Sequence, residues 1–148
     1  MSAIDLDQAT ADALIALPKV RANDEETHFP VAGGHLSLPL LSRDGRESFS
    51  LDIRRGRFDL RKGTYQNRAR QIIVLVRLDF GGPPHRNPDG AEIPCPHLHI
   101  YREGYGDKWA VAVPSDAFPH LPDPWQTLQD FMHYCTILDP PNIQRGIL

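Results

Sequence analysis

The sequence predicts an α+β protein with a strongly bent antiparallel sheet, or a small barrel, of five to seven strands and a helix at each end. Short segments in the middle of the chain alternate apolar and polar residues, which is typical of half-buried strands. Turns containing glycine and aspartate separate these segments, and both ends of the chain show helical spacing instead. A chain of 148 residues can bury one hydrophobic core, so we expect a single domain over residues 1–148.

The two predicted helices lie near the ends of the chain. The apolar residues that define the first are Leu6, Ala9, Ala13, Leu14 and Leu17. Pro18 ends this helix, because proline cannot continue the hydrogen-bond pattern. The second covers residues 123–138, with Asp123 as the N-cap and Pro124 at the first helical position. Its inward side chains are predicted to be Leu128, Phe131, Met132 and Cys135.

The predicted strands are residues 35–42, 47–56, 57–63, 70–80, 97–101 and 108–113. The segment 70–80 gives the strongest signal. One of its faces is wholly apolar and consists of Ile72, Val74, Val76, Leu78 and Phe80. The other face ends in Arg77 and Asp79, so we expect that end to be solvated or functional. The following loop, 81–96, is expected to be ordered, because its prolines restrict the unfolded chain.

The most informative segment contains two histidines on alternate positions. Cys95, His97, His99 and Tyr101 are expected to share one face of a strand, with successive side chains about 6.5 to 7 Å apart. The intervening Leu98 is expected to enter the core. If 108–113 pairs with this strand as a hairpin, Lys108 and Trp109 come close to the row. Arg77, Asp79 and His85 reach the same region from the preceding strand and loop.

This inventory favours metal-free phosphodiester cleavage. Two imidazoles beside a phosphate can serve as general base and general acid, and a cationic side chain can stabilise the charge of the transition state. His97 and His99 are the predicted acid–base pair, and Tyr101 is a positioning donor. The candidate catalytic residues are Arg77, His85, His97, His99, Tyr101 and Lys108. We predict neither a metal nor another cofactor.

The charge distribution points to a polyanionic partner. The net charge is −3, but residues 46–77 contain nine basic residues and three acidic ones. Clustered cations bind nucleic acids by releasing counterions from the phosphates. We therefore predict contact with nucleic acid, RNA in particular. The predicted contact residues are Arg54, Arg57, Arg61, Arg68 and Arg102. The alternative interpretation is a solvated strand face with paired charges.

Two other interpretations of the histidines remain open. A strand His-x-His pair could bind a metal, and residues 97–103 match the HxHxxxE half-motif of cupins. The third ligand could be Asp79, His85, Asp89 or Glu103, but each would require a loop to fold back in one particular way. For this reason the prediction excludes a metal. Alternatively, the histidines are structural and hold the proline-rich loop by hydrogen bonds.

The two cysteines are far apart, and the start of the chain does not resemble a signal peptide. Both features favour a reducing, cytoplasmic setting. No apolar run approaches the ~20 residues that a membrane-spanning helix needs. We therefore expect no membrane contact.

Residues 64–113, with their GGPPHRNPDG loop and PCPHLHIYREGYGDKWA segment, resemble the signature of a family of bacterial proteins of about this length with no assigned function. The matching residues are Tyr65, Arg77, Asp79, His85, Asn87, Asp89, His97, His99, Tyr101, Arg102, Tyr105, Asp107, Lys108 and Trp109. The resemblance implies cargo of mobile elements or prophages. It leaves two hypotheses: an RNA-cleaving enzyme or toxin, and a non-catalytic binding protein such as an anti-defence inhibitor or a toxin-neutralising partner.

Overall fold

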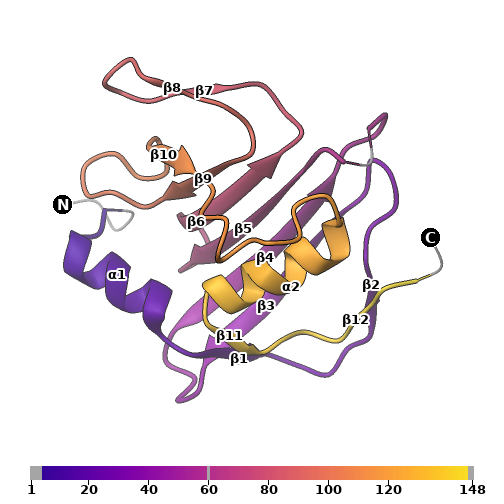
Figure 1. Cartoon of the computed structure of the whole chain (residues 1–148). Coiled ribbons are helices and arrows are strands. Elements are labelled where there is room, and N and C mark those ends of the chain that lie inside the picture. The colour runs from indigo at the N-terminus through magenta and orange to yellow at the C-terminus, as the bar shows by residue number, and fades with distance from the viewer. Residues whose placement is uncertain (1–4, 60, 147–148) are drawn as a thin grey trace.

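The computed structural model describes residues 5–59 and 61–146. In chain order its elements are α1 (Gln8–Ala16), β1 (Lys19–Arg21), β2 (Thr27–His28), β3 (His35–Ser42), β4 (Ser48–Arg55), β5 (Gly63–Ala69), β6 (Ile73–Phe80), β7 (His85–Arg86), β8 (Glu92–Ile93), β9 (His97–Ile100), β10 (Ala110–Ala112), α2 (Pro124–Tyr134), β11 (Ile137–Asp139) and β12 (Ile143–Gln144). Figure 1 shows α2 lying across one face of the sheet.

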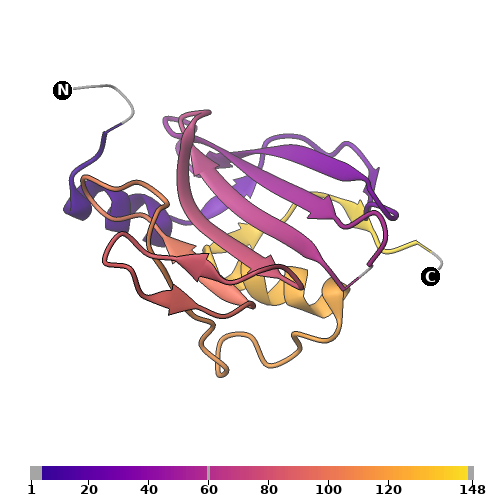
Figure 2. The same cartoon turned by 90° about the horizontal axis from the view of Figure 1, so that it is seen from above.

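Within these described residues the main sheet has eight strands, in the order β10-β9-β6-β5-β4-β3-β1-β11. Its pairs are antiparallel except β1–β11, which is parallel. The sheet does not close, since β10 and β11 are its two edges, and Figure 2 shows the open arrangement from above. The α+β class with a mostly antiparallel sheet is confirmed. The barrel alternative and the count of five to seven strands are wrong.

α2 begins where its predicted cap places it. Asp123 accepts hydrogen bonds from the amides of Trp125 and Gln126, and Pro124 begins α2. The predicted inward residues of α2 are buried. The helix ends at Tyr134, because Thr136 adopts a left-handed φ of 58° and the chain turns into β11. A helix at the C-terminal end is therefore wrong, since strands follow α2.

Three of the residues predicted to face the core from the first helix do so, because Leu6 and Leu14 are buried and Leu17 packs against the core. Ala11 and Leu14 are buried, whereas Ala9 and Ala13 are exposed. The prediction was wrong at Ala9 and Ala13 and missed Ala11, because alanine suits either environment. In the described part of the chain, no helix is long and apolar enough to cross a membrane.

The described residues 57–59 and 61–62 form no strand, and Phe58 is 96% exposed; Gly63 begins β5. The Gly56 amide donates to the Lys62 carbonyl across the turn between β4 and β5. Leu60, which the strand prediction included, lies outside the described residues. The longest strand that the prediction missed is β5, because its buried positions carry Tyr65 and Asn67 in place of an apolar series; the short strands β1, β2, β7, β8, β11 and β12 were also missed.

A bulge in β6 changes which side chains reach the core. Val76 pairs with Asn67 and Val74 with Arg68, which leaves Leu75 without an opposite residue on β5. The even-numbered face therefore enters the core only from Val76 onward. Ile72, which the prediction put on that face, is 60% exposed.

The two faces of the sheet differ in chemistry. On the face under α2, the Tyr65 ring contacts Phe80 and Phe131, and its hydroxyl donates to the Pro124 carbonyl. Tyr65 pairs with Leu78 across the ladder, so both point toward α2. The alternate residues point to the opposite face, which is polar.

Candidate functional site

The candidate site lies where β6 and β9 pair. Asp79 is opposite His97, and Arg77 is opposite His99. Leu98, between the two histidines, is fully buried in the core. The prediction that His97 and His99 share one face while Leu98 enters the core is therefore confirmed. The pairing also brings Arg77 and Asp79 to the histidines.

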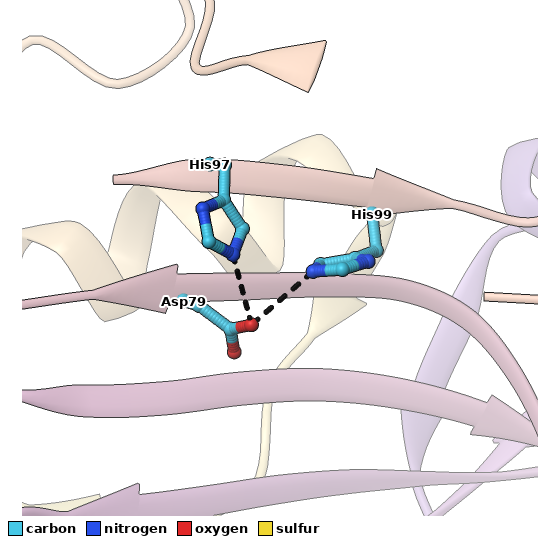
Figure 3. Close-up of side chains that lie close together, drawn as sticks. All are labelled: Asp79, His97 and His99. Carbon is cyan, nitrogen blue, oxygen red and sulfur yellow. Dashed lines mark hydrogen bonds and ion pairs between the residues drawn. The ribbon is translucent and has the colours of Figure 1, made fainter. Parts of the chain in front are cut away.

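One carboxylate oxygen contacts both imidazoles. Asp79 Oδ2 lies 3.3 Å from Nε2 of His97 and 3.2 Å from Nε2 of His99 (Figure 3). Burial raises the pKa of Asp79, but the neighbouring His99, the charge of Arg77 and a hydrogen bond from the Thr64 hydroxyl outweigh it and hold the pKa at about 2. Burial lowers the pKa of His97, although the charge of Asp79 opposes this. At neutral pH the cluster thus contains a carboxylate and a neutral His97.

Arg77 and Asp107 complete the surroundings of His99. Arg77 Nη1 lies 2.7 Å from Asp107 Oδ2, its Nε 3.3 Å from Asp79 Oδ2, and its Nη2 3.1 Å from His99 Nε2. His99 Nδ1 lies 2.7 Å from the carbonyl oxygen of Asp107. Because a carbonyl can only accept, Nδ1 carries the hydrogen, and Nε2 of the neutral ring carries the lone pair.

The loop before β9 covers the histidines. The ring of His85 lies 4.5 Å from that of His99 and 5.8 Å from that of His97, centroid to centroid. Its Nε2 donates to the carbonyl of Lys108, 2.7 Å away. Lys108 therefore contributes its backbone to this cluster. Under this cover His99 is fully buried and His97 is 3% exposed.

Tyr101 and Glu103 face away from the histidines. The Tyr101 hydroxyl accepts from the Leu6 amide at 2.8 Å and donates to the Leu6 carbonyl at 3.0 Å, within the core. β9 ends at Ile100, so strand alternation no longer sets the direction of Tyr101, and its predicted position on the histidine face is wrong. Glu103 accepts from the Gln8 amide at 2.8 Å. The HxHxxxE ligand set of the cupin hypothesis is therefore not assembled.

A cleft of about 770 Å³ opens on the polar face beside this cluster. The charged and imidazole side chains that line it are His35, Asp52, Arg54, Arg55, Lys62, Arg68, Arg77, Asp79, His85 and His97. Arg68 Nη2 donates to Asp52 Oδ1 at 2.9 Å, and Arg77 pairs with Asp79. Arg54 and Lys62 also line the cleft and form no ion pair among the described residues.

The five predicted RNA-binding arginines are divided by the structure. Arg54 and Arg68 line the cleft, whereas the described lining does not include Arg57, Arg61 or Arg102. Arg61 pairs with Asp59 in the exposed turn, and the guanidinium of Arg102 lies 4.1 Å from the centre of the Trp109 ring. The sequence analysis missed Asp52, Lys62 and His35. Alternation on β3 and β4 is the signal for His35 and Asp52, whereas Lys62 lies in the turn before β5 and carries no such signal.

Asp79, His97 and His99 have the chemistry of metal ligands. One donor atom from each lies within 4.8 Å of the other two. A metal was not expected, because each candidate third ligand required a loop to fold back in one particular way. That reason is wrong, because Asp79 reaches the histidines from the neighbouring strand β6.

Comparisons with known proteins place the chain in a family without giving it an activity. No curated protein and no solved structure matches it. A bacterial or prophage origin stays a prediction. The model described as "Family of unknown function (DUF6978)" matches residues 6–137, and the chain therefore belongs to this family.

Proposed function

We propose that this protein binds single-stranded RNA in the cleft and cleaves a phosphodiester at the end of the cleft formed by Asp79, His85 and His97. The charge of the cleft carries this proposal. Arg54 and Lys62 line it and make no ion pair among the described residues, whereas its two carboxylates are paired with arginines. Such cations bind phosphates by counterion release.

The size of the cleft favours a short stretch of one strand. Ligand pockets have volumes of about 300 to 1,000 Å³, and this cleft of about 770 Å³ falls within that range. One or two nucleotides are therefore the expected occupants, with the rest of the strand outside. We infer a cytoplasmic protein, where Cys95 and Cys135 stay unpaired.

The proposal revises the acid–base pair. His99 has no exposed surface and is not part of the cleft lining, whereas His85 and His97 both line it. We assign contact with the scissile phosphate to His85 and His97. Arg77, which also lines the cleft, would stabilise charge on that phosphate.

The test measures binding of a labelled single-stranded RNA by fluorescence anisotropy over a range of salt concentrations. The change is Arg54→Gln with Lys62→Gln. If both contact phosphates, the slope of log affinity against log salt should flatten by about 1.4, at 0.7 for each phosphate. The matched control, Arg46→Gln with Arg145→Gln, removes the same charge outside the cleft lining and should leave the slope unchanged.

Cleavage is followed on the same RNA by gel electrophoresis. His97→Ala should abolish cleavage while binding persists. If the activity makes the protein a toxin, its induction should slow growth of the host and His97→Ala should relieve the effect. Binding without cleavage by the wild type would favour a non-catalytic RNA-binding protein. No binding of RNA at low salt would exclude the proposal and favour a protein-binding module, such as an anti-defence inhibitor or a toxin-neutralising partner.

A further inference from the structure

We propose that Asp79, His97 and His99 form a binding site for one divalent transition-metal ion, with Zn²⁺ as the probe. This inference goes beyond RNA binding and does not depend on it; with the ion bound, His97 would act as a ligand and no longer as the acid–base group proposed above. The three side chains come from two paired strands, so the ladder between β6 and β9 holds them in place. Imidazole nitrogen and carboxylate oxygen are ligands that Zn²⁺ and similar ions accept.

The two distances from Asp79 Oδ2 match those between neighbouring ligands of one ion. Bonds of about 2.0 to 2.2 Å in tetrahedral or octahedral geometry separate neighbouring ligand atoms by about 2.9 to 3.5 Å. Asp79 Oδ2 lies 3.3 Å from His97 Nε2 and 3.2 Å from His99 Nε2. All three donor atoms fall within 4.8 Å of one another.

The hydrogen bonds of His99 leave its Nε2 aimed at an oxygen that cannot donate to it. Nδ1 donates to the Asp107 carbonyl, so the lone pair of Nε2 faces the charged Asp79 Oδ2. A proton on Nε2 would relieve this contact, but it would then point at the N–H group of Arg77 Nη2, 3.1 Å away. Here the Arg77 guanidinium contacts both Nε2 and Oδ2 and supplies the positive charge, and a metal cation between the two atoms would take its place. The backbone contact at Nδ1 is the kind of outer hydrogen bond that orients metal-binding histidines.

The site is open on one side. Asp79 and His97 line the cleft, whereas His99 lies behind them and is fully buried. Three protein ligands and an open position toward a cleft are typical of catalytic rather than structural zinc sites. Arg77 would lose its contacts with His99 and Asp79 when the ion binds. It keeps Asp107 as a partner, 2.7 Å away.

The experiment uses the full chain without a histidine tag, stripped of metal with a chelator. Co²⁺ is added first, and its visible d–d absorption is recorded. Zn²⁺ is then added in competition, and bound zinc is counted by elemental analysis after dialysis. The wild type should show a d–d spectrum, bind one zinc per chain, and melt at a higher temperature with zinc, since an ion that binds only the native state stabilises it.

Asp79→Asn and His97→Ala should each weaken zinc binding by about a hundredfold or more, a loss at least as large as that for an outer-shell partner. His35→Ala is the matched control, because His35 lines the same cleft away from the cluster and should leave affinity unchanged. Circular dichroism checks that each variant folds. If neither variant folds, the wild-type spectrum decides: absence of a d–d band with equimolar Co²⁺ overturns the proposal.

Zinc binding that survives in folded Asp79→Asn and His97→Ala would also overturn it. Metal binding is measured without RNA, and the RNA affinity of the metal-free protein is measured with chelator present. A protein that binds RNA but no zinc can therefore be told apart from one that binds zinc but no RNA.

Discussion

The side chain of Lys19, at the start of β1, donates a hydrogen bond of 2.8 Å to the carbonyl oxygen of Cys135, at the C-terminal end of α2. Its ammonium group also donates to the carbonyls of Ile15 and Leu17, at the end of α1. Lys19 therefore caps the last turns of both helices from one buried position. Carbonyls at helix ends lack partners within the helix, and a cation there also interacts favourably with the helix dipole.

The first prediction follows from the burial of Lys19. Burial lowers the pKa of Lys19 to about 8, although the nearby Cys135 acts to raise it. The unfolded chain keeps this proton up to about pH 10.4. Between these values the unfolded state binds more protons, so stability contributed through Lys19 rises with pH, by up to about 3 kcal/mol. Urea unfolding of the wild type and of Lys19→Met from pH 7 to 10.5 measures the difference. If the free energy of unfolding changes with pH by the same amount in both proteins, the prediction is wrong.

The second prediction concerns acid stability. Burial raises the pKa of Asp52, but hydrogen bonds from Arg68, Gln66 and Ser37 outweigh it, so the pKa lies below its usual range. This stabilisation is present above about pH 4, the pKa of an aspartate in the unfolded chain. It is lost as the pH falls through the lower pKa that Asp52 has in the folded state. Asp52→Asn should therefore cost about 1 to 2 kcal/mol at pH 7, and the cost should shrink on acidification.

Urea unfolding at neutral and acidic pH measures this cost. Asp116→Asn, which changes an exposed carboxylate, is the control and should stay close to the wild type throughout. A cost for Asp52→Asn that does not change with pH would show that the loss is in packing rather than in the ionised form of Asp52.

The third prediction concerns Phe58, which is 96% exposed in the turn between β4 and β5. The two ends of this turn, Gly56 and Lys62, line the cleft. If RNA leaves the cleft over this turn, Phe58 stacks on a base, an interaction of about 1 to 3 kcal/mol. Phe58→Ala should weaken RNA binding about five- to hundredfold at an unchanged salt slope. Val31→Ala, at another exposed apolar residue, is the control for a general surface effect.

The fourth prediction concerns order in the loop 81–96. Asn87 is buried, donates to the Ala110 carbonyl at 2.9 Å, and accepts from the Ala110 amide at 2.8 Å. Asn87→Ala leaves both backbone groups without this partner, so it should cost about 1 to 3 kcal/mol and speed amide exchange throughout the loop. Asp89→Ala, which removes only a local bond to the Ala91 amide, should have a smaller effect. Wild-type exchange as fast as at the termini would refute an ordered loop.

The fifth prediction follows from the metal site and concerns Arg77. A guanidinium group about 5 Å from a divalent ion repels it by about 1.7 kcal/mol even with the screening of bulk water. Arg77→Gln should therefore tighten Zn²⁺ binding about tenfold in competition with Co²⁺. The same change removes a cation from the cleft lining, so RNA affinity should fall. Weaker zinc binding in this variant would mean that Arg77 is needed to orient Asp79.

The sequence by itself determined the local structure where periodicity and caps act over a few residues. Strands β3, β4, β6 and β9 follow from alternation, and α2 begins at Asp123 because a capping side chain and Pro124 act within one turn. The shared face of His97 and His99 also follows from alternation alone. These features depend on neighbours in the chain, so a single sequence contains the information.

Only the tertiary structure decided what those side chains meet. Asp79 contacts both histidines because β6 and β9 pair in one register, and a shift by one residue would turn it to the other face. The bulge at Leu75 buries Ile73 and exposes Ile72 in the same way. Register depends on packing between segments distant in the chain, which no local pattern encodes.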